Sequence, residues 1–233
     1  MKVLLFSLAV LAALPASASF IVGLPADPTF GNCIPFGCAY QGEYQQVYTS
    51  SVFTGPITIT GLSFFNTQSF SPATQMNSGT WTISLSTTSA DWNSLSTTFA
   101  ANIGTDNTVV FSGDLSQPWA FGDTLSIALS APFTYNPAAG NLLMDVQVSG
   151  AANSGNSPIG FDVNGEVVAN AIMGRVFTTQ GGVGGNGVTN GFGLVTGFDT
   201  ATSSVPEAPS ALLLGAGLGL LGIANLVHRN CRA

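Results

Sequence analysis

The chain contains very little charge, and positive charge is the scarcest. Only 6% of its 233 residues are charged, against roughly 25% in an ordinary globular domain. Lysine and arginine together number four, and three of these, Lys2, Arg229 and Arg232, lie at the two ends of the chain. Between residues 19 and 204 the only cation is Arg175, which stands against 10 acidic residues. A surface of this kind cannot neutralise phosphates, which excludes nucleic acids and anionic lipid headgroups as partners of this region.

Histidine is equally scarce, and this removes most catalytic chemistry. The single histidine, His228, lies close to the C-terminus, and residues 19–204 contain no lysine either. Serine and cysteine nucleophiles therefore have no histidine base in that region. Glycosidase chemistry needs two acids that flank a sugar, but the acids here mostly stand next to Gly, Asn or Thr, as turn residues do. We therefore expect a protein that is not an enzyme and has no cofactor.

Cysteine occurs three times, and two of the three residues are close neighbours. Cys33 and Cys38 enclose Ile-Pro-Phe-Gly, a tight loop that can close as a disulfide in an oxidising compartment. Two free thiols are the alternative. A zinc site would need more ligands than these two cysteines, and both His228 and Cys231 lie in the C-terminal tail. The sequence therefore predicts a disulfide and an oxidising environment.

Residues 1–18 have the layout of a secretion signal. Lys2 supplies the positive charge at the start, and Val3–Leu14 forms an apolar run of the usual length. Small residues in Pro15–Ala18 then provide a site for signal peptidase, and we predict cleavage after Ala18. The apolar run is shorter than the ~20 residues that a membrane span requires, which argues against the alternative of an uncleaved anchor.

A second apolar segment precedes the C-terminus and predicts a transmembrane helix at residues 210–227. Ala211–Val227 contains no charged residue and would measure about 26 Å as a helix, near the lower limit for crossing a bilayer. Arg229 and Arg232 follow in the tail at 228–233 and are predicted to stop transfer, which places this tail in the cytoplasm and the body outside. The preceding linker, residues 200–209, contains prolines that keep it extended, the form that a protease cleft binds.

Val205-Pro206-Glu207, followed by the apolar helix and the basic terminus, resembles the PEP-CTERM sorting signal of exported bacterial proteins. The core of that signal is Pro-Glu-Pro, whereas Ala208 stands between Glu207 and Pro209 here. The resemblance implies that an exosortase, a membrane-embedded protease, recognises Val205, Pro206, Glu207 and Pro209. It also implies a membrane-anchored precursor that ends at the cell surface or outside the cell. A C-terminal anchor that is never cleaved is the alternative.

Residues 19–199, between the two signals, have the alternating pattern of β-strands. Apolar residues stand at every second position of 80–86, 125–129 and 142–148, and clusters of Gly, Pro, Asn and Asp separate such runs. About eight to ten strands of this kind predict an all-β fold, a single antiparallel two-sheet sandwich of the jelly-roll type. The signal peptide and the C-terminal transmembrane helix would flank this domain. The helical spacing of Trp92, Leu95 and Phe99 predicts a turn or two of helix.

Two features are candidates for ligand binding. Asp162, Asn164 and Glu166 place oxygen atoms at alternate positions, as at the start of a calcium loop, although the closing glutamate of an EF-hand is missing. An Asn-Gly hairpin turn is the alternative interpretation. Trp92 and Trp119 stand beside turn residues, where tryptophan rings can stack on sugars. Packing of these rings within the protein is the alternative.

The sequence therefore supports two functions of different classes. We expect a non-catalytic exported surface or extracellular-matrix protein, sorted through the PEP-CTERM signal and embedded in extracellular polysaccharide. The alternative is a glycan-binding β-sandwich module, with or without calcium. A groove lined by Trp92 or Trp119 together with two or more acids would favour the second function.

Overall fold

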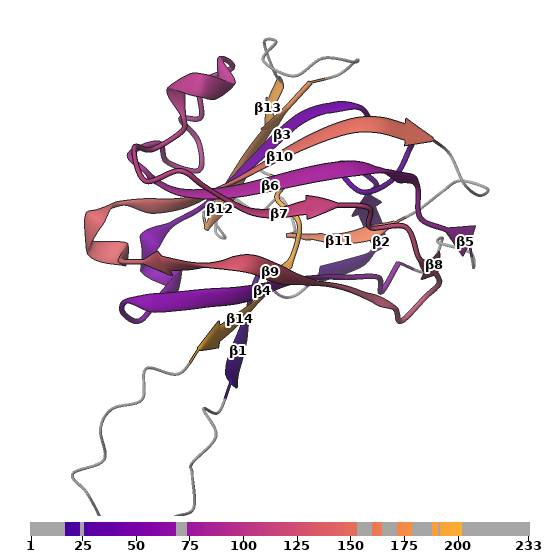
Figure 1. Ribbon diagram of the computed structural model, residues 1–233, viewed down its shortest axis with the longest axis horizontal. Coiled ribbons are helices and arrows are strands. Elements are labelled where there is room, and N and C mark those ends of the chain that lie inside the picture. Colours follow the sequence, from indigo (N-terminus) through magenta and orange to yellow (C-terminus); the bar gives the residue numbers. More distant parts are fainter. Residues whose placement is uncertain are drawn as a thin grey trace, which may run out of the picture. The chain divides into compact units, whose positions relative to one another are not determined.

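The computed structural model describes residues 17–23, 26–68, 74–152, 160–164, 172–178, 188–190 and 192–201. They belong to one compact unit, Ala16–Thr202, and form 14 antiparallel strands with three short 3-10 helices (Figure 1). The predicted all-β class is confirmed. Among these residues no helix is long and apolar enough to cross a membrane. The predicted transmembrane segment 210–227 and the first 16 residues of the predicted signal lie outside them.

One sheet has four strands, in the order β1-β14-β4-β9. These strands are β1 Ser17–Val22, β14 Thr196–Ala201, β4 Ile57–Phe65 and β9 Thr124–Tyr135. Strict alternation in β9 turns Leu125 and Ile127 into the core and leaves Ser126 exposed, because successive side chains of a strand point to opposite faces. The outer face is hydroxylic, and Thr58 and Thr134 on neighbouring strands lie 3.3 Å apart through their hydroxyl oxygens.

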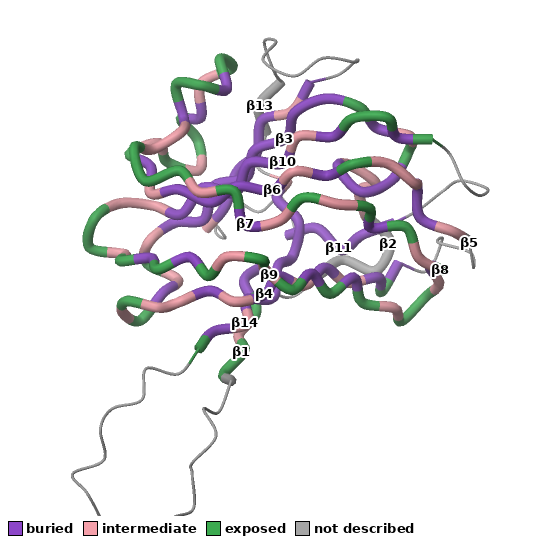
Figure 2. The backbone as a smooth tube through the Cα atoms, in the orientation of Figure 1, coloured by how far each residue is buried: buried purple, intermediate pink, exposed green. Residues whose placement is uncertain are grey.

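The other large sheet has six strands, in the order β13-β12-β3-β10-β6-β7. They are β13 Val188–Asn190, β12 Met173–Phe177, β3 Gly42–Tyr48, β10 Asn141–Ala152, β6 Ser78–Thr88 and β7 Thr108–Gly113. Every residue of β3, one of the two central strands, is buried (Figure 2). Both faces of β3 must therefore be packed against other parts of the chain.

Short elements complete the unit. β2 Ala26–Asn32 pairs with β11 Phe161–Asn164, and β5 Thr74–Gln75 pairs with β8 Pro118–Trp119. The 3-10 helices are η1 Ser50–Val52, η2 Phe99–Ala101 and η3 Pro137–Ala139. The strands outnumber the eight to ten expected in part because β5 and β8, with two residues each, are too short to show alternation.

The inner faces of the two large sheets share one hydrophobic core. Tyr48 of β3 meets Phe198 of β14 edge to face, with ring centroids 5.1 Å apart, and its hydroxyl lies 2.8 Å from the hydroxyl of Thr196. Trp81 of β6 is fully buried, as expected from its alternation with Ile83. Full burial of each such apolar side chain stabilises the fold by about 1.5–3 kcal/mol.

A second, smaller cluster covers the outer face of the six-stranded sheet. Residues 89–107, which connect β6 to β7 and are called the cap below, pack Leu95 and Phe99 on Val47, Leu143 and Val176 of the sheet. The predicted helical turn is present only as the 3-10 turn η2. The cap explains why β3 is buried on both faces.

Candidate functional site

The two ends of the described chain lie side by side in the four-stranded sheet. β1 and β14 pair antiparallel, and Ser17 is the register partner of Ala201 (Figure 1). The segments before residue 17 and after residue 201 are therefore attached at one edge of the domain. The predicted cleavage point after Ala18 falls inside β1, where the hydroxyl of Thr200 donates to the Ala18 carbonyl at 3.0 Å. Cleavage there would leave Ser19–Val22 in the strand.

The predicted sorting residues follow β14 in the sequence. The motif residues and the stop-transfer arginines are outside the described residues; they are Val205, Pro206, Glu207, Pro209, Arg229 and Arg232. Pro206 follows Ala201 by five positions, a separation that an extended chain spans in about 17 Å.

A cavity of about 340 Å³ lies at the same edge. Its walls are mostly apolar, and they consist of Ala18, Phe20, Val52, Phe53, Thr54, Ile57 and Thr200. Neither a tryptophan nor an acid lines it. It therefore differs from the groove that would have favoured a glycan-binding module.

The tryptophans expected to bind sugars have different environments. Trp119 is fully buried, its ring stacks on Phe161 at 4.5 Å, and its indole nitrogen donates to the Gly160 carbonyl at 3.0 Å. Its ring is thus part of the core and offers no exposed face to a sugar. Trp92 is partly exposed, packs against the cap cluster and follows the exposed Asp91. Of the two, only Trp92 keeps surface for a ligand.

The residues expected to form a calcium loop are largely engaged within the protein. Asp162 is 3% exposed, and its carboxylate accepts hydrogen bonds from the Thr67 amide at 2.8 Å, the Thr67 hydroxyl at 2.9 Å and the Gln68 amide at 2.7 Å. Asn164 is also buried, and Glu166 lies outside the described residues. Asp162 thus fastens β11 to the segment that follows β4.

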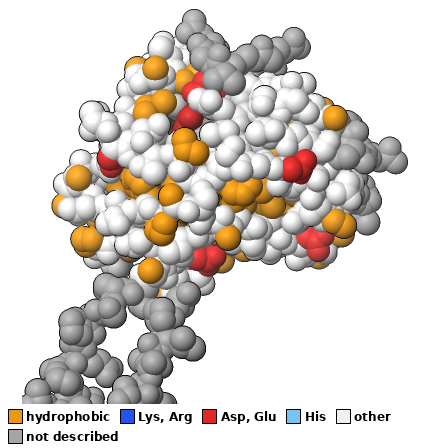
Figure 3. Space-filling model, in the orientation of Figure 1, with side chains coloured by type: hydrophobic (Ala, Val, Ile, Leu, Met, Phe, Trp, Pro, Cys, Tyr) orange, Lys and Arg blue, Asp and Glu red, His pale blue; other side chains and the backbone are white. Residues whose placement is uncertain are grey.

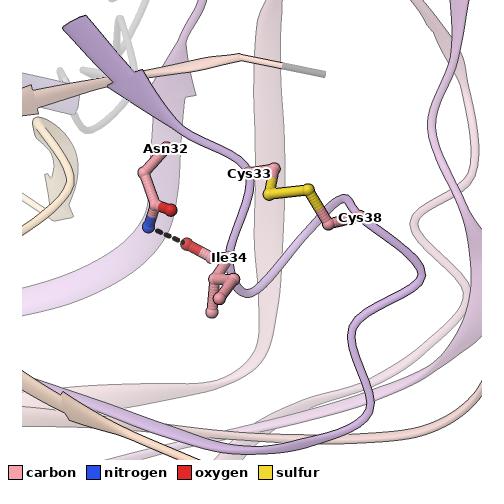
Figure 4. The surroundings of a disulfide bond; sticks show 4 residues. All are labelled: Asn32, Cys33, Ile34 and Cys38. Carbon is pink, nitrogen blue, oxygen red and sulfur yellow. Dashed lines mark hydrogen bonds between the residues drawn. A yellow bond between two sulfur atoms is a disulfide. The ribbon is translucent and has the colours of Figure 1, made fainter. Parts of the chain in front are cut away.

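The predicted disulfide between Cys33 and Cys38 is present, with the two Cα atoms 5.6 Å apart (Figure 4). The side-chain amide of Asn32 donates to the Ile34 carbonyl at 2.8 Å and steadies the entry to the loop (Figure 4). Phe36, at the centre of the loop, is fully buried. The loop is thus held in place both by the disulfide and by the packing of Phe36 in the core.

A polar bracket between the sheets is a feature that sequence reasoning missed. Gln46 of β3 points into the core, where its side-chain oxygen accepts from the Leu194 amide at 2.7 Å and from the Tyr44 hydroxyl at 2.5 Å. Its side-chain nitrogen donates to the Leu194 carbonyl at 2.9 Å. Leu194 shortly precedes β14, so Gln46 joins the six-stranded sheet to the chain that enters the four-stranded one. The only sign of this bracket in the sequence is that the polar Gln46 stands at the same alternate positions as Tyr44 and Tyr48.

Arg175, the only basic residue that the structure describes, is inside the protein. It is 8% exposed, and its guanidinium lies 4.9 Å from the centre of the Phe177 ring. Burial lowers the pKa of Arg175. The described surface consequently presents acids without any basic side chain, as the face in Figure 3 illustrates. A surface with acids and without basic side chains repels anions.

Comparison with models of protein families, with curated proteins and with solved structures finds no match to this chain.

Proposed function

We propose that the chain is a non-catalytic exported surface or extracellular-matrix protein, sorted through a C-terminal PEP-CTERM-type signal. The observation that carries this proposal is the pairing of Ser17 with Ala201. A domain that is delivered by an N-terminal signal and then held by a C-terminal helix is attached to the membrane twice in succession. With both attachments at one edge, the rest of the domain is free to fold and to face outward.

The surface chemistry agrees with such a role. The described surface has no basic side chain, and the outer face of the four-stranded sheet presents Ser and Thr hydroxyls. Hydroxyls hydrogen-bond to water and to polysaccharide without attracting polyanions. The Cys33–Cys38 disulfide fits an oxidising compartment outside the cytoplasm. These properties suit a protein embedded in extracellular polysaccharide.

The shared core of the two large sheets supports a two-sheet sandwich of the jelly-roll type as the architecture of this body. The glycan-binding alternative has less support. Trp119 is buried in the core, and the cavity beside β1 contains neither an acid nor an indole ring. We therefore favour a scaffold over a lectin-like module.

The proposed partners are signal peptidase and an exosortase-type protease, and the decisive measurement is the C-terminal residue of the surface protein. It should be determined by mass spectrometry in a host that contains the protease and in one that lacks it. Truncation near Glu207 is expected only in the first host. An intact Ala233 in both hosts would mean that the tail is only an anchor, and the sorting proposal would fail.

Substitution at the motif separates recognition from membrane insertion. Glu207→Ala is expected to leave insertion intact and to slow processing, because the carboxylate serves recognition and not hydrophobic partitioning. Glu166→Ala removes a glutamate outside the motif and is the matched control, with normal processing expected. Replacing both Arg229 and Arg232 by Ala should release part of the precursor uncut, since each arginine costs roughly 2.5–3.5 kcal/mol at the bilayer centre.

A further inference from the structure

Two buried carboxyl groups lie together on the outer face of the six-stranded sheet. Glu43 of β3 and Asp145 of β10 are each 3% exposed. In the register of these strands Asp145 is opposite Gln45 and Gln147 is opposite Glu43, so all four side chains project from one face of neighbouring strands. Asp145 and Glu43 are therefore diagonal neighbours on this face, at a separation that long side chains can bridge. Two buried carboxylates placed in this way cannot both be ionised without a large penalty.

Among the residues that the structure describes, no basic side chain projects from this face of the sheet. Arg175, the one basic residue that the structure describes, is opposite Gln46 and therefore projects from the other face of the sheet. On the same face, β6 offers Ser84 opposite Asp145, and β12 offers Val176 opposite Gln45. The hydroxyl of Tyr40 donates to the Glu43 backbone carbonyl at 2.6 Å, and the cap acids Asp91 and Asp106 are exposed to solvent.

One side-chain oxygen of Asp145 lacks a hydrogen-bond donor among the described residues. Its Oδ1 is buried and receives no hydrogen bond from any group that the structure describes. A buried acceptor left in this state costs about 1–3 kcal/mol. A hydrogen bond between the two carboxyl groups requires a proton on one of them: a protonated Glu43 would donate to Asp145, and a protonated Asp145 would donate to Glu43. A single proton therefore satisfies the oxygen and removes one of the two charges.

We propose that Glu43 and Asp145 share one proton, and that this shared proton fastens the cap, residues 89–107, to the sheet. Gln45, opposite Asp145, connects the pair to the cap: its side-chain nitrogen donates to the Phe99 carbonyl at 3.2 Å, and its oxygen accepts from Asn102 at 2.9 Å. Loss of the proton places two negative charges beside Gln45, and these attract its side-chain nitrogen more strongly toward Asp145 and away from the Phe99 carbonyl. The cap loses its polar attachment to β3.

The pH range of this change follows from the environment of Asp145. Burial, and then the neighbouring Glu43 carboxyl, raise the pKa of Asp145 from 3.8 to about 7. A group whose pKa is raised on folding contributes stability that is complete below its unfolded pKa and is lost as the pH rises through its folded pKa. The shared proton is therefore held in acidic surroundings and released as the pH passes neutrality.

The first test is denaturant unfolding of the wild type and of Asp145→Asn between pH 4 and pH 9. The amide introduced by this substitution imitates the protonated carboxyl group at every pH. Relative to the variant, the folding equilibrium constant of the wild type should therefore fall about tenfold per pH unit between pH 4 and pH 7, about a thousandfold in all, and stay level above that range. Glu43→Gln should shift the wild-type change to lower pH, because the second charge is gone. Identical pH profiles for all three proteins would overturn the proposal.

The second test follows the cap itself by hydrogen exchange. The amides of Ala101 and Asn102 are bonded to Thr98 and Phe99 within the cap at 3.0 Å. After correction for intrinsic exchange, their protection should decline from pH 5 to pH 8 in the wild type and stay constant in Asp145→Asn. Amides of β9 serve as the internal control. An equal decline in β9 and in the cap would mean that the proton affects the whole domain, and the proposed fastening of the cap would be wrong.

Should Asp145→Asn fail to fold, infrared spectroscopy of the wild type tests for the shared proton directly. A carbonyl stretch from a protonated carboxyl group is expected at pH 6, and Glu43→Gln should reduce it. A spectrum that contains only carboxylate bands at pH 6 would contradict the shared proton.

Discussion

The disulfide loop allows two contributions to stability to be separated. The loop from Cys33 to Cys38 holds Phe36, whose ring packs 4.7 Å from Phe64 and 5.6 Å from Phe161. The carbonyl that precedes Phe36 also accepts the indole hydrogen bond of Trp81 at 3.1 Å. We predict that the side chain inside the loop stabilises the domain more than the covalent link that closes it.

The magnitudes follow from burial and from loop length. Phe36 is fully buried, and replacing a buried phenylalanine by alanine costs about 3–5 kcal/mol. A disulfide that closes only six residues removes little chain entropy, which gives about 2 kcal/mol. For a domain of this size each kcal/mol lowers Tm by about 2–4 °C. Phe36→Ala should therefore lower Tm by roughly 6–20 °C, and the double variant C33S/C38S by roughly 4–8 °C.

Calorimetry and urea unfolding of the purified domain compare the two variants directly. Phe121→Ala is the matched control, because this phenylalanine is 64% exposed and its loss should change the free energy of unfolding by less than about 0.5 kcal/mol. Should C33S/C38S lose more stability than Phe36→Ala, the covalent link would be the main anchor of the loop, and the reasoning from core packing would be refuted.

Two further predictions concern buried polar groups of β3. Gln46→Leu should lower the free energy of unfolding by about 1–3 kcal/mol for each backbone group of Leu194 that is left unpaired, and urea unfolding measures this loss. The control is Gln117→Leu, at a half-buried position outside the bracket, which should leave the free energy of unfolding nearly unchanged. Burial raises the pKa of Tyr44 to about 12, so its stabilising contribution is complete below pH 10 and lost as the pH rises through 12. Ultraviolet titration should detect its phenolate only together with alkaline unfolding, and a normal titration near pH 10 in the folded protein would contradict the burial argument.

The regular part of the fold could be predicted from the sequence because each strand is an amphipathic ribbon. In β10, Leu142, Met144, Val146 and Val148 all belong to the shared core, as their spacing of two requires. The disulfide could be predicted for a similar reason, since two cysteines five positions apart in a Pro/Gly loop have few other partners. The local alternation of polar and apolar residues was sufficient to predict a strand wherever one face of that strand packs on the core.

Features that depend on distant segments could not be predicted. The polar side of β3, Glu43 and Gln45, has the composition of a solvent-exposed face, yet the structure buries both residues. Trp119 stands among turn residues and has no alternation around it, yet the pairing of β8 with β5 and its contact with Phe161 place it in the core. Both outcomes are set by segments that lie far away in the sequence.

The order of strands connects these findings with the proposed export. β14 is paired on one side with β1 and on the other with β4. The residues of β1 that signal cleavage would remove, Ser17 and Ala18, therefore lie at an edge, and β14 keeps its pairing with β4 after they are lost. Cleavage near Glu207 would also occur outside the sheet. A domain built in this order can lose both of its proposed signals without losing a central strand, which is what a protein that is processed at both ends requires.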